Sequence, residues 1–93
     1  MLNKEKLIGK WRSLDIAKYG NIELHFDNQN NFEYKIIEDK NTQIIKLTYK
    51  IDGDYIVTDQ PSSSKEEKTK ANIINNILEL EFNGVSSKYE KVV

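Results

Sequence analysis

The sequence Gly9-Lys10-Trp11 opens the first predicted strand, and the predicted fold is organised around it. Trp11 is the only tryptophan of the chain, and the residues after it read as a run of short strands with no long helical segment. Residues 3–8, which precede this strand, can form one short helical turn with Asn3 as its N-cap. We therefore expect a small β-barrel in which Trp11 forms the floor.

Alternation of apolar and polar side chains marks the strands. In residues 21–26, Ile22, Leu24 and Phe26 share one face, as the two-residue period of a half-buried strand requires. Turn-forming residues separate the strands, and the longest predicted loop contains the Pro/Ser-rich and charged residues 60–68. The predicted strands span residues 9–16, 21–26, 32–37, 43–51, 54–59, 69–74, 77–82 and 85–92.

Tight turns predict the register between neighbouring strands. Two-residue turns at Asn75-Asn76 and Asn83-Gly84 place apolar or small residues opposite one another on one face. A slip of one residue would turn that whole set toward solvent. The predicted pairs are Phe82–Val85, Leu80–Ser87, Leu78–Tyr89, Ile73–Leu78, Ala71–Leu80, Phe26–Phe32, Leu24–Tyr34, Ile22–Ile36, Ile36–Ile45, Tyr34–Leu47 and Phe32–Tyr49.

The strand after Gly53 has two alternative orientations. A two-residue turn at Asp52-Gly53 points Ile56 toward the interior. A three-residue turn with a bulge at Gly53 points Tyr55 and Val57 inward instead. We favour the orientation in which Ile56 faces inward.

These strands can close into a barrel. A flat meander would leave its apolar face wet and two edges unpaired, whereas closure buries the face and removes the edges. Tight sequential hairpins favour this order over a two-sheet sandwich, which is the alternative. The predicted fold class is all-β, an eight-stranded antiparallel up-and-down meander closed into a small barrel with a short N-terminal helical turn. It forms one domain over residues 1–93.

Composition excludes several classes of function. The 14 basic and 15 acidic residues give a formal net charge of -1, which argues against a nucleic-acid partner. The chain has no cysteine, so disulfides, thiolate metal sites and cysteine nucleophiles are excluded. The sequence contains no apolar run near the roughly 20 residues of a transmembrane segment, and no signal peptide is visible. We expect a cytoplasmic protein if Met1 is the native start, and a cell-envelope or secreted protein otherwise.

The motif Gly9-Lys10-Trp11 after a helical turn, followed by an antiparallel meander, resembles the calycin superfamily. The greatest similarity is to the small bacterial lipocalin-like domains, and it covers nearly the whole chain. Lipocalins usually carry an arginine near the last strand that lies over the tryptophan, where this chain has Lys88 and Lys91. The family pattern is matched here by Gly9 and Trp11, by Phe26 and Phe32, by Tyr49 before Asp52-Gly53, and by Leu78 and Leu80.

An up-and-down order assigns the loops to two ends of the barrel. The helical turn shares one end with loops 27–31, 52–53 and 75–76, and we expect that end to be closed. The other end, which carries the long loop 59–68, is the predicted mouth. The interior is either a filled core or a small apolar pocket in which tyrosine hydroxyls orient a ligand. Candidate lining residues of such a pocket are Tyr34, Leu47, Tyr49, Leu80, Phe82 and Tyr89.

Residues with catalytic or metal-binding chemistry are sparse. His25 is the only histidine and falls on an outward face between two acidic residues. The serines at 62–64 have no base placed for them, and the Asp52/Asp54 pair is far short of a calcium cage. The charged residues 65–68 read as a solvated run. We therefore expect a protein that is not an enzyme, with no catalytic residues, no metal site and no cofactor.

Several apolar residues are predicted to face outward, and they form a candidate interaction patch. Two hypotheses follow. The first is a non-enzymatic lipocalin-like barrel that binds a small hydrophobic ligand. The alternative is a protein-interaction module, such as an inhibitor or immunity-type protein, that uses its outer face or loops as a monomer or weak homodimer. The candidate patch comprises Ile37 and Ile44 as a cross-strand pair, Tyr55 and Val57, and Ile74 and Ile77 as a second pair.

Overall fold

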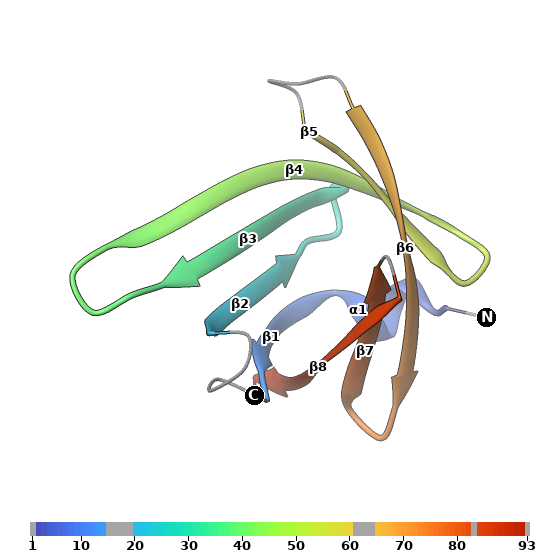
Figure 1. The fold of residues 1–93 in the computed structure, drawn as a ribbon. Helices are drawn as coiled ribbons and strands as arrows, with labels where there is room; N and C mark the ends of the chain where they lie inside the picture. Colours follow the sequence, from blue (N-terminus) through green and yellow to red (C-terminus); the bar gives the residue numbers. More distant parts are fainter. Residues whose placement is uncertain (1, 15–19, 61–64, 83, 93) are drawn as a thin grey trace.

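The structure, a computed structural model, describes residues 2–14, 20–60, 65–82 and 84–92. Figure 1 shows its short helix and its strands. Three strands, β2, β7 and β8, have the predicted bounds, and residues 15 and 16 of the first predicted strand lie outside the described residues. The elements are α1 (Lys4–Leu7), β1 (Gly9–Ser13), β2 (Asn21–Phe26), β3 (Asn31–Ile37), β4 (Thr42–Asp52), β5 (Tyr55–Gln60), β6 (Lys65–Ile74), β7 (Ile77–Phe82) and β8 (Val85–Val92).

Helix α1 begins where the sequence predicts because Asn3 caps it. The Asn3 side-chain oxygen accepts hydrogen bonds from the backbone N–H groups of Glu5, at 2.8 Å, and Lys6, at 3.4 Å. These bonds satisfy backbone donors that the first turn of a helix leaves without partners. Leu7, at the other end of the helix, is fully buried. The helix therefore presents its last residue to the core.

Helix α1 covers the predicted closed end of the barrel. The backbone N–H of Leu2, just before it, donates to the carbonyl of Gly53 at 3.4 Å. The Lys4 ammonium donates to the side-chain oxygen of Asn30, in the loop between β2 and β3. The helix also borders the turn at residues 75–76. The three loops that were predicted to share this end thus lie beside the helix.

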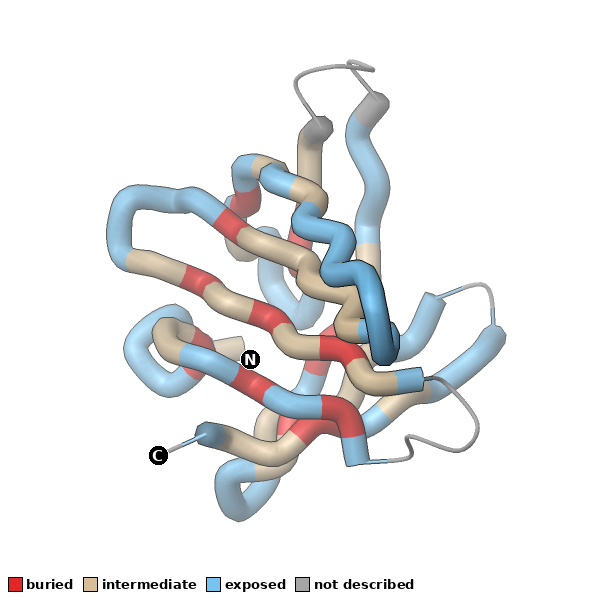
Figure 2. Tube along the Cα trace, turned by 90° about the vertical axis from the view of Figure 1, so that its left-hand side faces the viewer, coloured by how far each residue is buried: buried red, intermediate tan, exposed pale blue. Residues whose placement is uncertain are grey.

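Burial alternates along the strands as the sequence predicts. In β2, Ile22, Leu24 and Phe26 are buried and the residues between them are not. Figure 2 shows such alternation of buried and more exposed positions along several strands. Full burial of one large apolar side chain contributes roughly 1.5–3 kcal/mol. The largest fully buried side chains all belong to one core cluster, and they are Trp11, Phe26, Leu7, Leu24 and Leu78.

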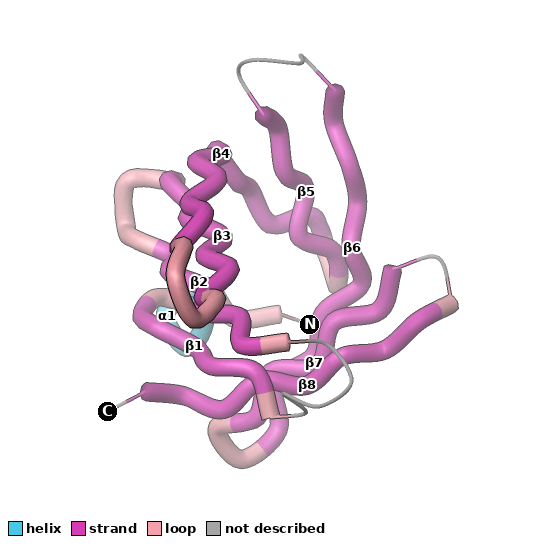
Figure 3. Tube along the Cα trace, turned by 60° about the vertical axis from the view of Figure 1, so that its left-hand side comes forward, coloured by secondary structure: helices cyan, strands magenta, loops and turns pink. Residues whose placement is uncertain are grey.

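The strands pair in chain order, and the sheet closes on itself. Each strand pairs antiparallel with the next, and β8 pairs with β1, so that Lys91 lies opposite Trp11. Figure 3 shows the strands following one another around the barrel. Closure gives the first and last strands a partner on both sides, which removes the open edges of a sheet. The predicted closed meander is confirmed, and the sandwich alternative is wrong.

The predicted register is confirmed for most hairpins. In the β6–β7 turn, Asn75 and Asn76 both have positive φ, 51° and 65°. Positive φ at both central residues defines the two-residue turn whose twist matches that of paired strands. The confirmed pairs are Phe82–Val85, Leu80–Ser87, Leu78–Tyr89, Ile73–Leu78, Ala71–Leu80, Phe26–Phe32, Leu24–Tyr34 and Ile22–Ile36.

The predicted register between β3 and β4 is wrong by two residues. Tyr34 lies opposite Ile45, and Phe32 lies opposite Leu47 rather than Tyr49. The connection is a four-residue loop, residues 38–41, in which the first N–H donates to the last carbonyl at 2.8 Å. A shift of two residues preserves which side chains face inward. For that reason the alternation of apolar residues could not distinguish the two registers.

The turn between β4 and β5 lies one residue later than predicted. Its central residues are Gly53 and Asp54, because Asp52 pairs with Tyr55. Ile56 is 2% exposed and belongs to the buried core cluster. The favoured orientation of this strand, with Ile56 inward, is therefore confirmed.

Strand β6 begins at Lys65, four positions before the predicted start at 69. The charged residues predicted to form a loop are thus paired with β5, with Glu66 opposite Asp59 and Glu67 opposite Thr58. Period-two alternation then puts successive charged residues on opposite faces of the barrel. The extension of β6 through this run places Glu67 on the inner face.

Candidate ligand cavity

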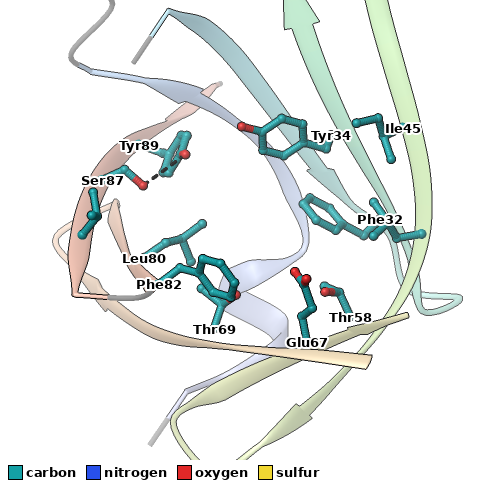
Figure 4. A pocket seen from close by; sticks show the side chains of 12 residues that line it. Phe32, Tyr34, Ile45, Thr58, Glu67, Thr69, Leu80, Phe82, Ser87 and Tyr89 are labelled. Carbon is teal, nitrogen blue, oxygen red and sulfur yellow. Dashed lines mark hydrogen bonds between the residues drawn. The ribbon is translucent and has the colours of Figure 1, made fainter. Parts of the chain in front are cut away.

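A cavity of about 430 Å³ lies inside the barrel, above the buried core. Figure 4 shows side chains from β3 and β4 on one side of it and side chains from β6, β7 and β8 on the other. Its position, away from α1, agrees with the predicted mouth. The residues that line it are Phe32, Tyr34, Ile45, Leu47, Thr58, Glu67, Thr69, Leu80, Phe82, Val85, Ser87 and Tyr89.

Phe32 joins the cavity to the core beneath it. Its ring stacks on the ring of Phe26, with centroids 4.4 Å apart and planes 3° apart. The ring of Tyr34 meets it edge-on, with centroids 6.4 Å apart. Such aromatic contacts add roughly 0.5–1.5 kcal/mol beyond the burial of area. The floor of the cavity therefore rests on the packed aromatic cluster.

Hydroxyl groups line part of the cavity. The Ser87 hydroxyl donates a hydrogen bond to the Tyr89 hydroxyl at 3.2 Å. Burial raises the pKa of the Tyr34 phenol above its usual value, and the neighbouring Tyr89 adds to the effect. Tyr34 is therefore neutral at pH 7, and its hydroxyl has no hydrogen-bond partner among the described residues. This hydroxyl is available to a bound molecule.

Glu67 is the one charged side chain among the described residues that line the cavity. Figure 4 shows its carboxylate pointing into the cavity, with Thr58 beside it. Thr58 lies directly opposite it on β5, and Thr69 lies on the same face two residues along β6. The cavity thus combines apolar walls with one anionic group flanked by hydroxyls.

Most of the predicted lining residues border this cavity, namely Tyr34, Leu47, Leu80, Phe82 and Tyr89. Tyr49 does not. It is buried, but its hydroxyl donates to the Asp27 carbonyl at 2.6 Å and its ring meets Phe26 edge-on. The two-residue shift between β3 and β4 explains the difference. Thr48 lies opposite Asn31, the first residue of β3, so Tyr49 lies beyond that strand, toward the closed end.

The candidate lining residues did not include four polar ones, Thr58, Glu67, Thr69 and Ser87. Of these, Ser87 was placed on the inner face by its predicted pairing with Leu80, which is confirmed. A signal for Glu67 was present in the alternation of β6. Ala71 and Ile73 pair with inward residues of β7, and the same two-residue period runs back to Thr69 and Glu67. The charged composition of residues 65–68 concealed this period.

Trp11 lies at the closed end, apart from the cavity. It is 1% exposed, and its indole N–H donates to the Leu7 carbonyl at 2.8 Å. The Lys91 ammonium lies 4.6 Å from the centre of the indole ring and also donates to the carbonyls of Lys6 and Ile8. Burial lowers the pKa of Lys91. A lysine on the last strand thus lies over the tryptophan.

The candidate outer patch is only partly exposed. Ile44, Tyr55 and Ile74 are 51%, 43% and 61% exposed. Ile74 pairs with Ile77 as predicted. The predicted pairing of Ile37 with Ile44 is wrong, because Ile37 lies opposite Thr42 and Ile44 lies opposite Lys35 in the shifted β3–β4 register.

Val57 is not part of an exposed patch, because it is 3% exposed. Its neighbours across the sheet are Lys50 on β4 and Lys68 on β6. Two ion pairs, each 3.7 Å, join β4 to β6 on this outer face: Lys50 with Glu66, and Lys68 with Asp52. The long side chains that make these pairs extend past β5, and their methylene groups can cover an apolar neighbour.

The described part of the chain contains no group of three or more His, Asp or Glu side chains arranged to hold a metal ion. No helix within the described ranges is long and apolar enough to cross a membrane. His25, on the outer face, lies 3.9 Å from Glu33 with its side chain 44% exposed. No family model matches the chain, and neither a curated protein nor a solved structure matches it.

Proposed function

We propose that this barrel binds a small hydrophobic ligand in its cavity and is not an enzyme. The observation that carries the proposal is a cavity of about 430 Å³ with mainly apolar walls and a few convergent polar groups. Ligand pockets typically measure about 300–1,000 Å³ and have this composition. The resemblance of the sequence to small lipocalin-like domains supports the same function.

The chemistry of the lining residues supports a binding role over a catalytic one. Nucleophilic catalysis by a serine requires a general base within hydrogen-bond reach. The Ser87 hydroxyl instead donates to Tyr89, and His25 lies on the outer face, away from the cavity. A carboxylate and neutral hydroxyls in an apolar cavity are suited to orienting a ligand.

Titration with the neutral fluorescent probe N-phenyl-1-naphthylamine tests this proposal. We expect its fluorescence to rise on binding and to saturate at one probe per chain. Leu80→Trp fills the cavity with a larger side chain and should abolish the rise. Ile44→Trp adds the same side chain to an outer position that is 51% exposed, so binding should persist. Thermal unfolding of both variants verifies that they fold.

The absence of any saturable rise with the wild-type chain would reject the proposal. Equal loss of binding in the folded Leu80→Trp and Ile44→Trp variants would show that the probe does not enter the cavity. Binding that survives Leu80→Trp would place the probe elsewhere on the protein.

A second candidate function is protein interaction through the outer face of the β6–β7 hairpin. It is favoured by Ile74, which is 61% exposed beside Ile77 and borders a hollow of about 320 Å³ with Glu79 and Lys88. Sedimentation equilibrium tests self-association through this face. If the face forms a weak homodimer, Ile74→Lys should shift the equilibrium toward monomer, whereas Ile44→Lys should not.

A further inference from the structure

Glu67 differs from the charged residues on either side of it. Glu66 and Lys68 face outward, and each forms an ion pair of 3.7 Å with a residue of β4. Glu67 faces inward and has no ion pair among the described residues. Figure 4 shows its carboxylate pointing into the cavity. The charge of Glu67 is therefore directed toward the space that a ligand would occupy.

The other described lining residues leave this charge unbalanced. They comprise aliphatic, aromatic and hydroxyl side chains, and none of them is a lysine, an arginine or a histidine. Glu67 is exposed at the rim of the cavity, so solvent screens part of its charge. The apolar walls on the other sides of the cavity weaken that screening for a ligand bound against them. A cation held in the cavity would gain from the carboxylate, and an anion would be repelled by it.

Acceptors for an ammonium group surround this position. An ammonium has three N–H donors and needs acceptor atoms for them. The Glu67 carboxylate and the hydroxyl oxygens of Thr58 and Thr69 lie on adjacent positions of one inner face. The aromatic rings of Phe32 and Phe82 also line the cavity, and ring faces attract cations. The apolar body of the ligand would lie against the remaining walls.

We infer that the ligand of this cavity is a protonated amine on a small apolar body, and that Glu67 selects it over neutral and anionic molecules of the same shape. This inference rests on the proposed binding function and adds to it the charge of the ligand. It also implies that fatty acids, whose carboxylate would face Glu67, bind poorly.

Three naphthalene compounds of nearly equal size test the inference. At pH 7, 1-naphthylmethylamine is a cation, 1-naphthylmethanol is neutral and 1-naphthoate is an anion. Displacement of N-phenyl-1-naphthylamine gives the affinity of each. A charge-assisted hydrogen bond changes affinity by about 10- to 100-fold. We expect the amine to bind at least about tenfold more tightly than the alcohol, and the carboxylate most weakly.

Glu67→Gln and Glu66→Gln form a matched pair of variants, because they remove the same charge from adjacent residues on opposite faces. Glu67→Gln should weaken amine binding about tenfold or more and strengthen carboxylate binding. It should leave binding of the alcohol within about twofold of the wild-type value. Glu66→Gln should leave all three affinities within about twofold, and thermal unfolding verifies that both variants fold.

The outcomes separate this inference from the proposed function. If the alcohol or the carboxylate binds as tightly as the amine, or if the two variants behave alike, the inference is wrong while the cavity remains a ligand site. If none of the three compounds and no neutral probe binds, the proposed function fails, and the inference fails with it.

Discussion

The ammonium of Lys91 lies 4.6 Å above the centre of the Trp11 ring, and the two residues are also direct partners across the β1–β8 pairing. This contact lies where β8 pairs with β1 and closes the barrel. The same ammonium donates to the carbonyl of Lys6, in α1, and to that of Ile8, just before β1. The Lys91 side chain therefore links helix α1 and strand β1 to strand β8 at the closed end.

Truncation of Trp11 should destabilise the protein strongly. Trp11→Ala removes a side chain that is 1% exposed together with its hydrogen bond to Leu7, and large-to-small changes of this kind cost about 3–5 kcal/mol. Lys91→Met keeps much of the volume and loses the charge, so we expect a smaller cost of about 1–2 kcal/mol. Urea unfolding measures both. A cost below about 1 kcal/mol for Trp11→Ala would contradict the role of Trp11 as the floor.

A side chain at Gly9 is expected to destabilise the protein through backbone strain and through displacement of the Lys91 ammonium. The φ of Gly9 is +131°, and a Cβ added there would lie 2.8 Å from the Lys91 ammonium nitrogen. Gly9→Ala should therefore displace the ammonium from Trp11 and strain the backbone, at a cost of about 1–3 kcal/mol.

A double-mutant cycle separates these two causes. In a Lys91→Ala background, Gly9→Ala should cost less than in the wild-type chain, since only the backbone strain remains. Gly84→Ala is the control. Gly84 also has positive φ, 78°, but a Cβ there would meet no atom within 4 Å, so its cost should not depend on Lys91. Additive costs for Gly9→Ala and Lys91→Ala would disprove the contact.

Removal of the Tyr49 hydroxyl should change stability, whereas removal of the Tyr34 hydroxyl should change ligand binding. Tyr49→Phe removes the hydrogen bond to the Asp27 carbonyl at the closed end and should cost about 1 kcal/mol of stability without changing probe affinity. Tyr34→Phe removes a hydroxyl of the cavity that has no partner among the described residues. It should leave stability nearly unchanged and weaken binding of ligands that reach it. Urea unfolding and probe titration distinguish the two outcomes.

Stability should fall as the pH rises above about 10. Burial raises the pKa of Tyr49, and the charge of Asp27 adds to the effect; burial likewise raises the pKa of Tyr34. A raised pKa in the folded state contributes stability that is fully present below the unfolded value and is lost as the pH passes through the folded value. Burial lowers the pKa of Lys91, and this contributes a change of opposite sign.

The double variant Tyr34→Phe, Tyr49→Phe isolates the tyrosine contribution, because Lys91 is unchanged in it. Urea unfolding between pH 8 and pH 11 should show a steeper loss of stability for the wild-type chain than for the double variant. Identical slopes would show that these phenols do not control the alkaline transition.

The turn residues were sufficient to predict the pairing of most hairpins, because a two-residue turn allows few registers between the strands it joins. The β6–β7 turn at Asn75 and Asn76 is an example, and its predicted pairs are confirmed. The β3–β4 register was missed because the four-residue loop spans residues 38–41 instead of 39–42. This displacement by one position shifts the pairing by two residues and keeps the same side chains inward. As a result Tyr49 was predicted to line the cavity, whereas it lies beside the loop at the closed end.

The class of fold was predictable from local patterns, since period-two alternation, capping at Asn3 and turn chemistry are properties of neighbouring residues. Which polar groups enter the barrel depends instead on pairing between strands. Glu67 belongs to a charged run whose composition resembles a solvated loop, and it faces inward because pairing with β5 extends β6 through that run. Closure also decided that Lys91 meets Trp11, because that contact joins strands at opposite ends of the chain.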